Sequence, residues 1–532
     1  MTRTRLSVGD AMATAAVATP VARFDLRTFV KILGPALAYP IAGVDPLLLN
    51  LNLSAVTDGL HLPSGSLGLL AGASTLVVAA SVLAVGNLGD RWGLKRILVY
   101  GLVANMMVAC ASALAPNYTA LLVLRFADGA TLAALLGVSL ALVSVSVPAR
   151  LRSTSIGVVM AVYTVMYGLT PLIGGWVVGA LGWRSLFLVT IPFALAALIL
   201  TARFVREPPV SRGHRLDLLG VGLFGVALLG LVSGIGAAPE GLGAPGFWAP
   251  LAVSVLATIG LVIHERRVPQ PALDLRLFRH RGFQIAVIAT VVVNVFSSGL
   301  ATVIGQLGNY VLDLSPEKIG LLYLPGTLVV AFASVVAGRE VATRTARPVL
   351  TLGLLIVGAS GAVMVATASP WMGIAVLVLA TWLSNLGGFV TGTAAADTIL
   401  GQAPTGRHGS VAAVQPAFAM AGYALGPTIV ILLLNFFFKH MWLMDAASKG
   451  VTEQAAQKAV ASVTGAVVSS PGTYGYTSLV SLADGLSIGI DYTDGVRLVM
   501  LLITLPPLVL SVVTYFYLPH SRSRRHRRVR SG

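Results

Sequence analysis

Long apolar runs separated by short polar connections dominate this chain. Most of the runs hold about 20 residues, the length of an α-helix that crosses the hydrocarbon core of a membrane. A backbone in contact with lipid must satisfy its own hydrogen bonds, so each run is predicted to be a helix. The pattern predicts fourteen spans, at residues 29–51, 67–88, 97–115, 121–147, 155–178, 185–204, 218–238, 247–264, 283–303, 319–337, 349–368, 371–394, 411–437 and 495–517.

The composition supports a membrane protein and excludes several other classes. Of 532 residues, 56% are hydrophobic and only 11% are charged, which is too apolar for a soluble domain of this length. The net charge of +16 does not indicate nucleic-acid binding, because the bases are scattered between apolar runs. The single cysteine, Cys110, permits neither a disulfide framework nor a cysteine metal site, and we expect it to be a small buried side chain.

Basic residues mark one side of the membrane. Arginine and lysine gather in alternate connections, from Arg23, Arg27 and Lys31 at the start to the tail at 522–530, whereas the intervening connections are almost bare. The positive-inside rule therefore predicts that both ends of the chain are cytoplasmic, in the plasma membrane. The bare side includes one long connection, 439–494, whose run 452–468 is amphipathic in pattern and fits either a surface-lying segment or a loose loop.

The connection at 86–98 is unusual because it holds one acid among three bases between two apolar runs. It is predicted to be a tight, water-facing turn in which Gly86 and Gly93 permit close approach or a positive φ. Asp90 is expected to cap the following helix or to pair with Arg91, Lys95 or Arg96. The stretch is either a clasp between helices or simple punctuation.

This stretch resembles the signature loop of major facilitator transporters, a Gly-x-Leu-x-Asp-Arg-x-Gly-x-Lys pattern. The chain matches it at Gly86, Leu88, Asp90, Arg91, Gly93 and Lys95 and departs from it at Leu94, where the family usually has a base. A degenerate copy at 338–350 replaces the acid by Ala342. The resemblance implies that Gly86, Asp90, Arg91, Gly93 and Lys95 form a conformational gate.

A second repeated pattern places the two halves of the chain. Halves of the family's Gly-x-x-x-Gly-Pro-x-x-Gly-Gly pattern occur in the fifth and thirteenth runs and predict helix packing at Pro171, Gly174, Gly175, Gly422, Gly426 and Pro427. The fold class expected is an all-α membrane protein with two pseudo-symmetric six-helix bundles and two inserted helices. The predicted parts are 1–28, a bundle at 29–204, a linker with two extra helices at 205–282, a bundle at 283–518 and a basic tail at 519–532.

The two inserted helices point to one branch of that superfamily. Motifs around them, at 215–220 and 265–278, look like those of the fourteen-helix drug:proton antiporter branch, as do Trp183, Arg184 and Pro192. The resemblance implies a proton-coupled exporter of hydrophobic or cationic small molecules, that is, a multidrug efflux protein. The fold would equally suit export of an endogenous lipid, siderophore or metabolite, and a non-transporting receptor is a third reading.

Ionisable residues within the spans require an explanation, because burying a charge in a membrane is costly. Asp45 lies toward the outer part of the first span beside Pro46, and it is either a coupling group or a helix-end carboxylate that reaches water. The branch has a Leu-Asp-x-Thr-x-x-Asn pattern here. This chain keeps its aspartate and asparagine, as Asp45 and Asn50, but has Leu47 in place of the threonine. The resemblance implies proton and substrate coupling at Asp45 and a place for Asn50 at the substrate cavity.

Arg125 lies at a depth similar to that of Asp45 and resembles the arginine of the family's Arg-x-x-Gln-Gly pattern, with Asp128 in place of the glutamine. A buried arginine needs a partner, so we expect it to pair with Asp128 on the same helix or with Asp45 across the bundle. Two acids that compete for one base form either a proton switch or a static ion pair. Near the end of its span, Asp397 is expected to be solvated.

Several neutral side chains are candidates for the substrate cavity. Asn294, Asn385 and Gln415 would line it or bond between helices, and Tyr163, Tyr167, Phe296, Trp382, Phe418 and Tyr423 would wall it or pack. The sequence has no phosphate-binding loop, paired-cysteine motif or nucleophile elbow, so neither ATP hydrolysis nor an enzyme is expected. The protein is predicted to act without cofactor, metal or nucleic acid, as a monomer among membrane lipids that exchanges protons for a small molecule.

Overall fold

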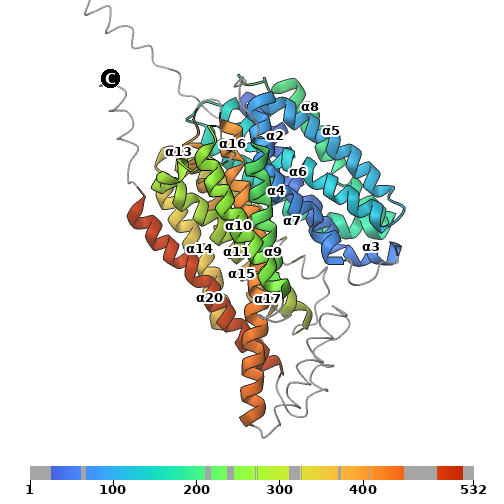
Figure 1. The fold of residues 1–532 in the computed structure, drawn as a ribbon, viewed down its shortest axis with the longest axis vertical. Coiled ribbons are helices and arrows are strands. Elements are labelled where there is room, and N and C mark those ends of the chain that lie inside the picture. The colour runs from blue at the N-terminus through green and yellow to red at the C-terminus, as the bar shows by residue number, and fades with distance from the viewer. Residues whose placement is uncertain are drawn as a thin grey trace, which may run out of the picture.

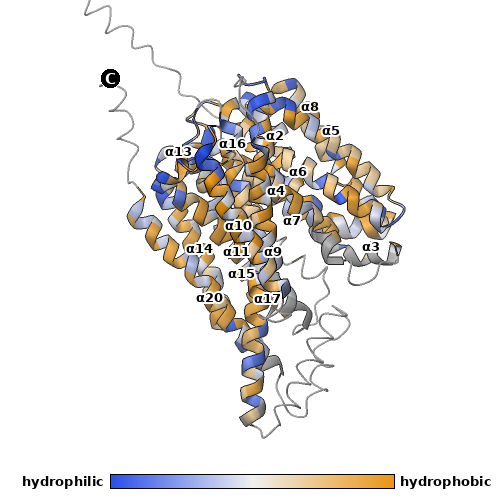
Figure 2. Cartoon of the chain, viewed as in Figure 1, coloured by the Kyte–Doolittle hydropathy of each residue, from blue (hydrophilic) through white to orange (hydrophobic). Residues whose placement is uncertain are grey.

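The structure is a computed structural model that describes residues 25–60, 67–209, 217–236, 245–310 except 270 and 272, 321, 324, 326–369, 373–404, 407–448 and 488–518. In these ranges, all regular secondary structure is helical. The helices run roughly along one direction, as Figure 1 shows. Figure 2 shows apolar residues along the middle of the helices and polar residues gathered mainly at one end of the bundle. This distribution is the one expected of a bundle that spans a bilayer.

The first half of the chain forms one packed group. Its members are α2 (Leu26–Leu51), the short α3 (Leu53–Leu60), α4 (Leu67–Trp92), α5 (Leu94–Ala113), α6 (Tyr118–Ser146), α7 (Arg152–Leu181), the 3₁₀ turn η2 (Trp183–Leu188) and α8 (Ile191–Phe204). Within the group, α2 packs against α6, α7 and α8, while α4 and α5 pack against α6. Asp25 begins α2 by accepting a hydrogen bond from the backbone N–H of Thr28, and this contact lowers the pKa of the Asp25 carboxyl.

The second half of the chain forms another packed group. It contains α11 (Arg281–Tyr310), preceded by the 3₁₀ turn η4 (Leu277–Arg279), then α13 (Thr327–Thr343), α14 (Ala346–Thr367), α15 (Ile374–Leu400), the short α16 (His408–Ala412), α17 (Val414–Ser448) and α20 (Ile488–Tyr517). The closest pairs are α14 with α15 and α11 with α17. The two groups meet where α7 packs against α13 and where α4 packs against α16 and α17.

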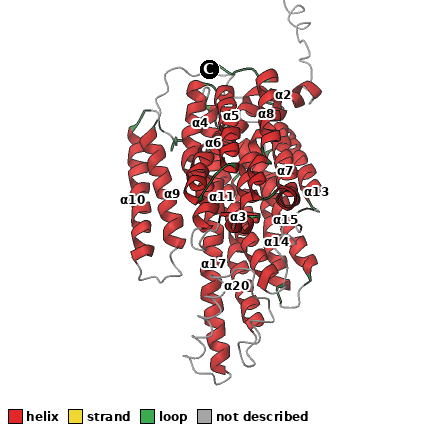
Figure 3. Ribbon diagram, turned by 90° about the vertical axis from the view of Figure 1, so that its right-hand side faces the viewer, coloured by secondary structure: helices red, strands yellow, loops and turns green. Residues whose placement is uncertain are grey.

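Two helices between the groups pack on each other at the side of the bundle. Figure 3 shows α9 (Leu218–Gly236) and α10 (Pro245–Arg267) beside the remaining helices. Helix α9 also contacts α4 of the first group and α17 of the second. Phe224 of α9 packs edge-on against Phe418 of α17, with ring centroids 5.9 Å apart. Phe418, one of the candidate cavity aromatics, therefore anchors the inserted pair.

Helices overlap all fourteen predicted spans, and twelve are long and apolar enough to cross a membrane by length and composition. The remaining two are α9, whose apolar stretch is the shorter 219–235, and α13, whose described part begins at Thr327. The fold prediction of an all-helical membrane protein is confirmed.

The predicted connections differ from the observed ones in two places. At 86–98, helix α4 continues to Trp92 and α5 begins at Leu94, so Gly93 alone makes the turn and Gly86 and Asp90 lie inside α4. At 439–494, α17 extends to Ser448 and α20 begins at Ile488, so helix occupies both ends of the predicted loop. The run 452–468 lies outside the described residues.

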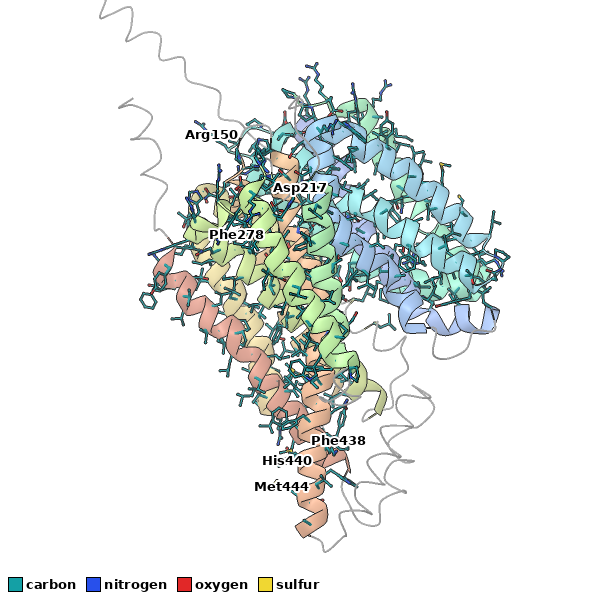
Figure 4. All side chains as sticks on the ribbon, viewed as in Figure 1. Arg150, Asp217, Phe278, Phe438, His440 and Met444 are labelled. Carbon is teal, nitrogen blue, oxygen red and sulfur yellow. The ribbon has the colours of Figure 1, made fainter. Side chains whose placement is uncertain are left out.

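Helix α17 is longer than a membrane requires. Its 35 residues correspond to about 52 Å at 1.5 Å per residue, against roughly 30 Å of hydrocarbon. Figure 4 places Phe438, His440 and Met444 on its far end, opposite the end of the bundle that carries Arg150. This extension projects from the end of the bundle that has few arginines.

Cys110 contradicts the prediction of a buried side chain, because it is exposed on α5. An apolar run inside a membrane helix has a lipid face as well as a packed face, and hydrophobicity alone does not distinguish them.

The glycines of the second repeated pattern have unequal surroundings. A Cβ at Gly174 would meet the side chain of Leu48, and one at Gly422 would meet the backbone of Val291, so each permits close approach of two helices. Gly426 lies against the side chain of Ser298 in the same way. At Gly175, by contrast, a Cβ would meet nothing within 4 Å, so this position does not need a glycine for packing. Pro171 and Pro427 lie inside α7 and α17.

Candidate functional site

A buried charge cluster occupies the interior of the first helical group. One guanidinium nitrogen of Arg125, Nη1, lies 2.6 Å from Asp45 Oδ1 and 2.9 Å from Asp128 Oδ2. The side chains come from α2 and α6 and are at most 6% exposed. The structure thus brings together the three residues that the sequence predicted for proton coupling, and the arginine contacts both acids at once.

Neutral side chains complete the cluster. Arg125 Nη2 donates to Ser74 Oγ at 2.6 Å, from α4. Asn105 Nδ2 of α5 donates to Asp128 Oδ1 at 3.1 Å and to Thr131 Oγ1 at 3.2 Å. Four helices of the first group therefore meet at this point. Two buried atoms, Arg125 Nε and Asn105 Oδ1, have no hydrogen-bond partner among the described residues.

The charges of this cluster do not cancel when every group is ionised. Two carboxylates and one guanidinium carry a net charge of −1, and one added proton makes the cluster neutral. Burial of an uncompensated charge in a medium of low dielectric constant is costly, and this cost applies to the fully ionised cluster and to the doubly protonated one alike. An arrangement of this kind is chemically suited to binding one proton. Among the described residues, no group of three His, Cys, Asp or Glu is suited to a metal ion.

A cavity of about 220 Å³ lies between the two helical groups. From the first half of the chain, its walls include Tyr39, Pro46, Thr75, Tyr163 and Tyr167. From the second half, they include Asn294, Ser297, Asn385, Gln415 and Tyr423. Tyr163 stacks on Tyr167 with ring centroids 5.6 Å apart, and the Tyr167 and Tyr423 hydroxyls lie 3.5 Å apart across the groups.

Five of the six residues proposed for the substrate cavity lie in these walls, namely Tyr163, Tyr167, Asn294, Asn385 and Gln415. The sixth, Asn50, falls within α2, but its side chain lies outside the described residues. Among the other candidate aromatics, Phe296 is fully buried and Trp382 lies under Gly326 in a smaller pocket. Whether the cavity residues contact a substrate stays a prediction.

The charge cluster and the cavity are lined by adjacent residues of the same two helices. On α2, Asp45 contacts Arg125 while the adjacent Pro46 and Leu47 line the cavity. On α4, Ser74 contacts Arg125 while the adjacent Thr75 lines the cavity. Movement of α2 or α4 on protonation would therefore reach the cavity wall directly.

At the arginine-rich end of the bundle, Asp90 joins the two helical groups. Its Oδ1 accepts the backbone N–H of Gly409 at 2.6 Å, and its Oδ2 accepts that of Ser410 at 2.8 Å. These N–H groups belong to the first turn of α16, whose partial positive charge favours a carboxylate. Gly86 lies directly against Gly409, so the backbones of α4 and α16 are in contact.

Asp90 therefore caps a helix of the opposite group, and the prediction that it would cap the following helix is wrong. Glu207 caps that helix, α5, by accepting the backbone N–H groups of Lys95 at 3.1 Å and Arg96 at 3.0 Å. Gly93 has φ +106°, and a Cβ there would meet the Glu207 carboxylate, so both geometry and space require glycine. Arg91 is exposed, and Lys95 Nζ donates to the Ala202 carbonyl at 2.8 Å.

Asp397 is buried, contrary to the expectation of a solvated helix end. Its Oδ1 accepts from Arg152 Nε at 2.9 Å and from Ser153 Oγ at 2.8 Å. It thus ties α15 to α7 at the same end of the bundle as Asp90. Close by, Gly157 of α7 and Gly338 of α13 lie against each other, with backbone where a Cβ would stand.

The sequence did not predict the neutral partners of the charge cluster, the cap of α5, or the residues that Asp90 contacts in the other helical group. Ser74, Asn105 and Glu207 carried no signal, because serine and asparagine are common in spans and a single glutamate after a helix resembles any solvated loop residue. The signal for Gly409 and Ser410 was weak but present, since a short polar stretch, 401–410, separates the span of α15 from the next one.

The chain is similar in sequence to several known proteins. A sequence model of the Major Facilitator Superfamily matches residues 36–427. The methylenomycin A resistance protein of Streptomyces coelicolor is 30% identical over 369 residues, which cover 69% of this chain and 77% of that protein. The multidrug efflux pump LfrA of Mycolicibacterium smegmatis is 28% identical over 435 residues, covering 80% of this chain and 85% of the pump.

Similarity to a solved structure supports the same fold. The proton:xylose symporter XylE, solved with a bound bromodeoxyglucose, superposes with a TM-score of 0.57 at 13% sequence identity, over 92% of this chain and 96% of the symporter. The two chains therefore share the same overall fold.

Proposed function

The chain belongs to the major facilitator superfamily, and on this premise we propose that it exports hydrophobic or cationic small molecules in exchange for protons. Its relatives carry the names of drug efflux and antibiotic resistance proteins. It is a multi-pass membrane protein of a transporter family rather than of an enzyme class. The observation that carries the proposal is the cluster of Asp45, Asp128 and Arg125 directly behind the wall of a central cavity.

In this proposal, Asp45 is the group that gains and loses the coupling proton. With Asp45 ionised, Arg125 is held between α2 and α6. Protonation of Asp45 weakens its attraction to Arg125, which then keeps Asp128 on its own helix. Helix α2, with Pro46 in the cavity wall, is thereby released from α6, and the affinity for cargo changes.

The contacts of Asp90 and Asp397 serve as the gate at the arginine-rich end. By the positive-inside rule, we infer that this end faces the cytoplasm and that both termini lie on that side. We propose the plasma membrane as the location of the protein. The protein acts as a monomer. With the gate formed, as in this structure, the path from the cavity to the cytoplasm is closed and cargo leaves outward. Its rupture opens the inward path for the next molecule.

The energetics of such an exchange are sufficient for export. A proton that moves through a membrane potential of 100 mV supplies about 2.3 kcal/mol. This supports a cargo gradient of roughly fiftyfold per proton, and a pH difference adds to it.

Replacement of Asp45 tests the proposal. We expect Asp45→Asn to abolish proton-driven efflux in proteoliposomes with an imposed pH gradient, because the amide cannot bind the coupling proton, while the protein remains folded in the membrane. Asp494→Asn is the matched control, since Asp494 pairs with Arg497 at the surface end of α20 and should transport normally. Full proton-dependent efflux by Asp45→Asn would remove Asp45 from the mechanism.

A further inference from the structure

The wall of the central cavity carries no formal charge. Among the described residues that line it, none is Asp, Glu, Lys, Arg or His. Its polar groups are tyrosine and serine hydroxyls, one threonine and the three amides Asn294, Asn385 and Gln415. The rest of the wall is aliphatic, aromatic or glycine, with Phe389 tilted against Tyr163 at a centroid distance of 5.5 Å.

Some of the amide groups have hydrogen-bonding capacity to spare. Gln415 Nε2 donates to the Gly392 carbonyl at 3.3 Å, which fixes the amide orientation and leaves Oε1 buried without a partner among the described residues. Within the described part of the chain, the Asn385 side chain makes no hydrogen bond, and Asn294 uses only Nδ2, toward the Thr290 carbonyl at 2.8 Å. A buried acceptor without a donor is costly, so a ligand that brings an N–H or O–H group is favoured here.

The acids behind the wall do not replace a charge within it. Asp45 and Asp128 are both held by Arg125, and none of the three lines the cavity, whereas their neighbours Pro46, Leu47 and Thr75 do. With one proton bound, the cluster is neutral and offers no net charge to a cation. A permanent cation in the cavity would lose its water without gaining a carboxylate partner. The tyrosine faces attract cations and neutral aromatic rings alike, so they do not decide between the two.

We propose, on the premise of the transport function above, that this cavity selects neutral, planar aromatic molecules that carry a hydrogen-bond donor, and discriminates against permanent cations. The rings stack against the group of Tyr163, Tyr167 and Phe389. The donor is accepted by the amide oxygens of Asn385 or Gln415, and the tyrosine hydroxyls can donate to a carbonyl of the ligand.

This ligand class has a consequence for the energetics of transport. Exchange of a neutral molecule for any number of protons moves net positive charge inward. Export would therefore respond to membrane potential even without a pH difference, whatever the stoichiometry. One monovalent cation exchanged for one proton would move no net charge.

Three fluorescent probes of similar size separate charge from hydrogen bonding. Acridone is neutral with an N–H donor, N-methylacridone is neutral without it, and N-methylacridinium is a permanent cation. We expect the purified full-length protein in detergent to bind acridone most tightly, with N-methylacridinium at least tenfold weaker. Binding of the cation as tight as or tighter than that of N-methylacridone overturns the proposal, as does failure of all three probes to bind.

Introducing a carboxylate into the wall tests the same idea from the other direction. Gln415→Glu, and separately Asn385→Asp, should shift the ratio of acridone to N-methylacridinium affinity at least tenfold toward the cation. Gln284→Glu is the matched control, because Gln284 lies at the start of α11, away from the cavity wall, and its substitution should leave the ratio unchanged. An unchanged ratio in both cavity variants contradicts the assignment, and two positions guard against misfolding of one.

The binding measurement uses no gradient, so it separates this proposal from that of proton-coupled transport. If probe selectivity is as expected but Asp45→Asn still transports normally, the coupling scheme fails and the ligand class stands. If Asp45→Asn loses coupling while the cation binds best, the ligand class fails and proton exchange stands.

Discussion

At the scale of single residues, Arg125 is the most constrained side chain of the charge cluster. It is 1% exposed and serves two acids and one serine from three helices with two nitrogens. The planar fork of a guanidinium makes this possible, whereas a lysine offers one compact charge. Because the buried charges of Asp45 and Asp128 depend on it, the cluster holds α2, α4 and α6 together and must also release them during transport.

Substitution of this arginine should reveal both roles. We expect Arg125→Lys to keep the charge but lose about 1–3 kcal/mol of stability through the contacts it cannot make, seen as a lower midpoint of thermal unfolding in detergent. Arg344→Lys is the control, since Arg344 is 73% exposed in its pair with Glu340 and should change little. Equal unfolding midpoints for both variants would show that the geometry of the buried fork is unimportant.

At the scale of elements, the turn between α4 and α5 is a single glycine. A carboxylate that is distant in the sequence hydrogen-bonds to the backbone just after it. Gly93 takes a φ of +106°, which other residues rarely adopt, and Glu207, just beyond the end of α8, caps two N–H groups that follow the turn. A change of backbone direction here would displace Asp90, so the cap helps to fix the direction in which the gate aspartate points.

An alanine at this turn should therefore be costly. Gly93→Ala forces a strained backbone and a contact with the Glu207 carboxylate, and we expect a loss of about 1–3 kcal/mol. The comparison is Gly179→Ala in α7, where a Cβ meets nothing within 4 Å and helix propensity improves. Thermal unfolding followed by helical circular dichroism measures both, and a Gly93→Ala protein as stable as Gly179→Ala would contradict the stated role of the turn.

At the scale of the whole molecule, two aspartates hold the helical groups together at one end. Asp90 contacts the beginning of α16, Asp397 contacts the beginning of α7, and each reaches from its own group into the other. Asp90 belongs to the second long helix of its group and Asp397 to the fourth of the other, so the two contacts are not symmetry-related copies. Both are hydrogen bonds at helix ends, so they can break and re-form without disturbing either core.

Weakening one of these contacts should open that end. Asp397→Asn removes the charge that pairs with Arg152, and a cost of about 1.4 kcal/mol to the closed state would raise the open population roughly tenfold. The exposed residues Arg150 and Arg279 are both replaced by cysteine and spin-labelled, and Cys110 is replaced by serine so that it is not labelled. The distance between the two labels then reports the separation of the two helical groups at this end. Glu340→Gln is the control, and a distance distribution for Asp397→Asn identical to that of the parent would exclude Asp397 from the gate.

The sequence predicts best those features that follow from the cost of burial in a membrane. It groups Asp45, Arg125 and Asp128, because a buried arginine must find an acid. The expected cap of α5 by Asp90 and the expected solvation of Asp397 are wrong, since these carboxylates bond to backbone N–H groups or side chains more than 240 residues away. The expectation for Cys110 is wrong because an apolar run does not tell its lipid face from its packed face.

The sequence by itself determined the helical class and the positions of the spans, because a bilayer forces each apolar run to satisfy its own backbone hydrogen bonds. It also determined the family, through the motif at 86–98 and the two inserted helices. Only the tertiary structure decided that both acids contact Arg125 at once, which helix end Asp90 caps, and that the cavity wall is uncharged. Those properties depend on which faces of distant helices pack together. The sequence of one helix does not show which other helix contacts it.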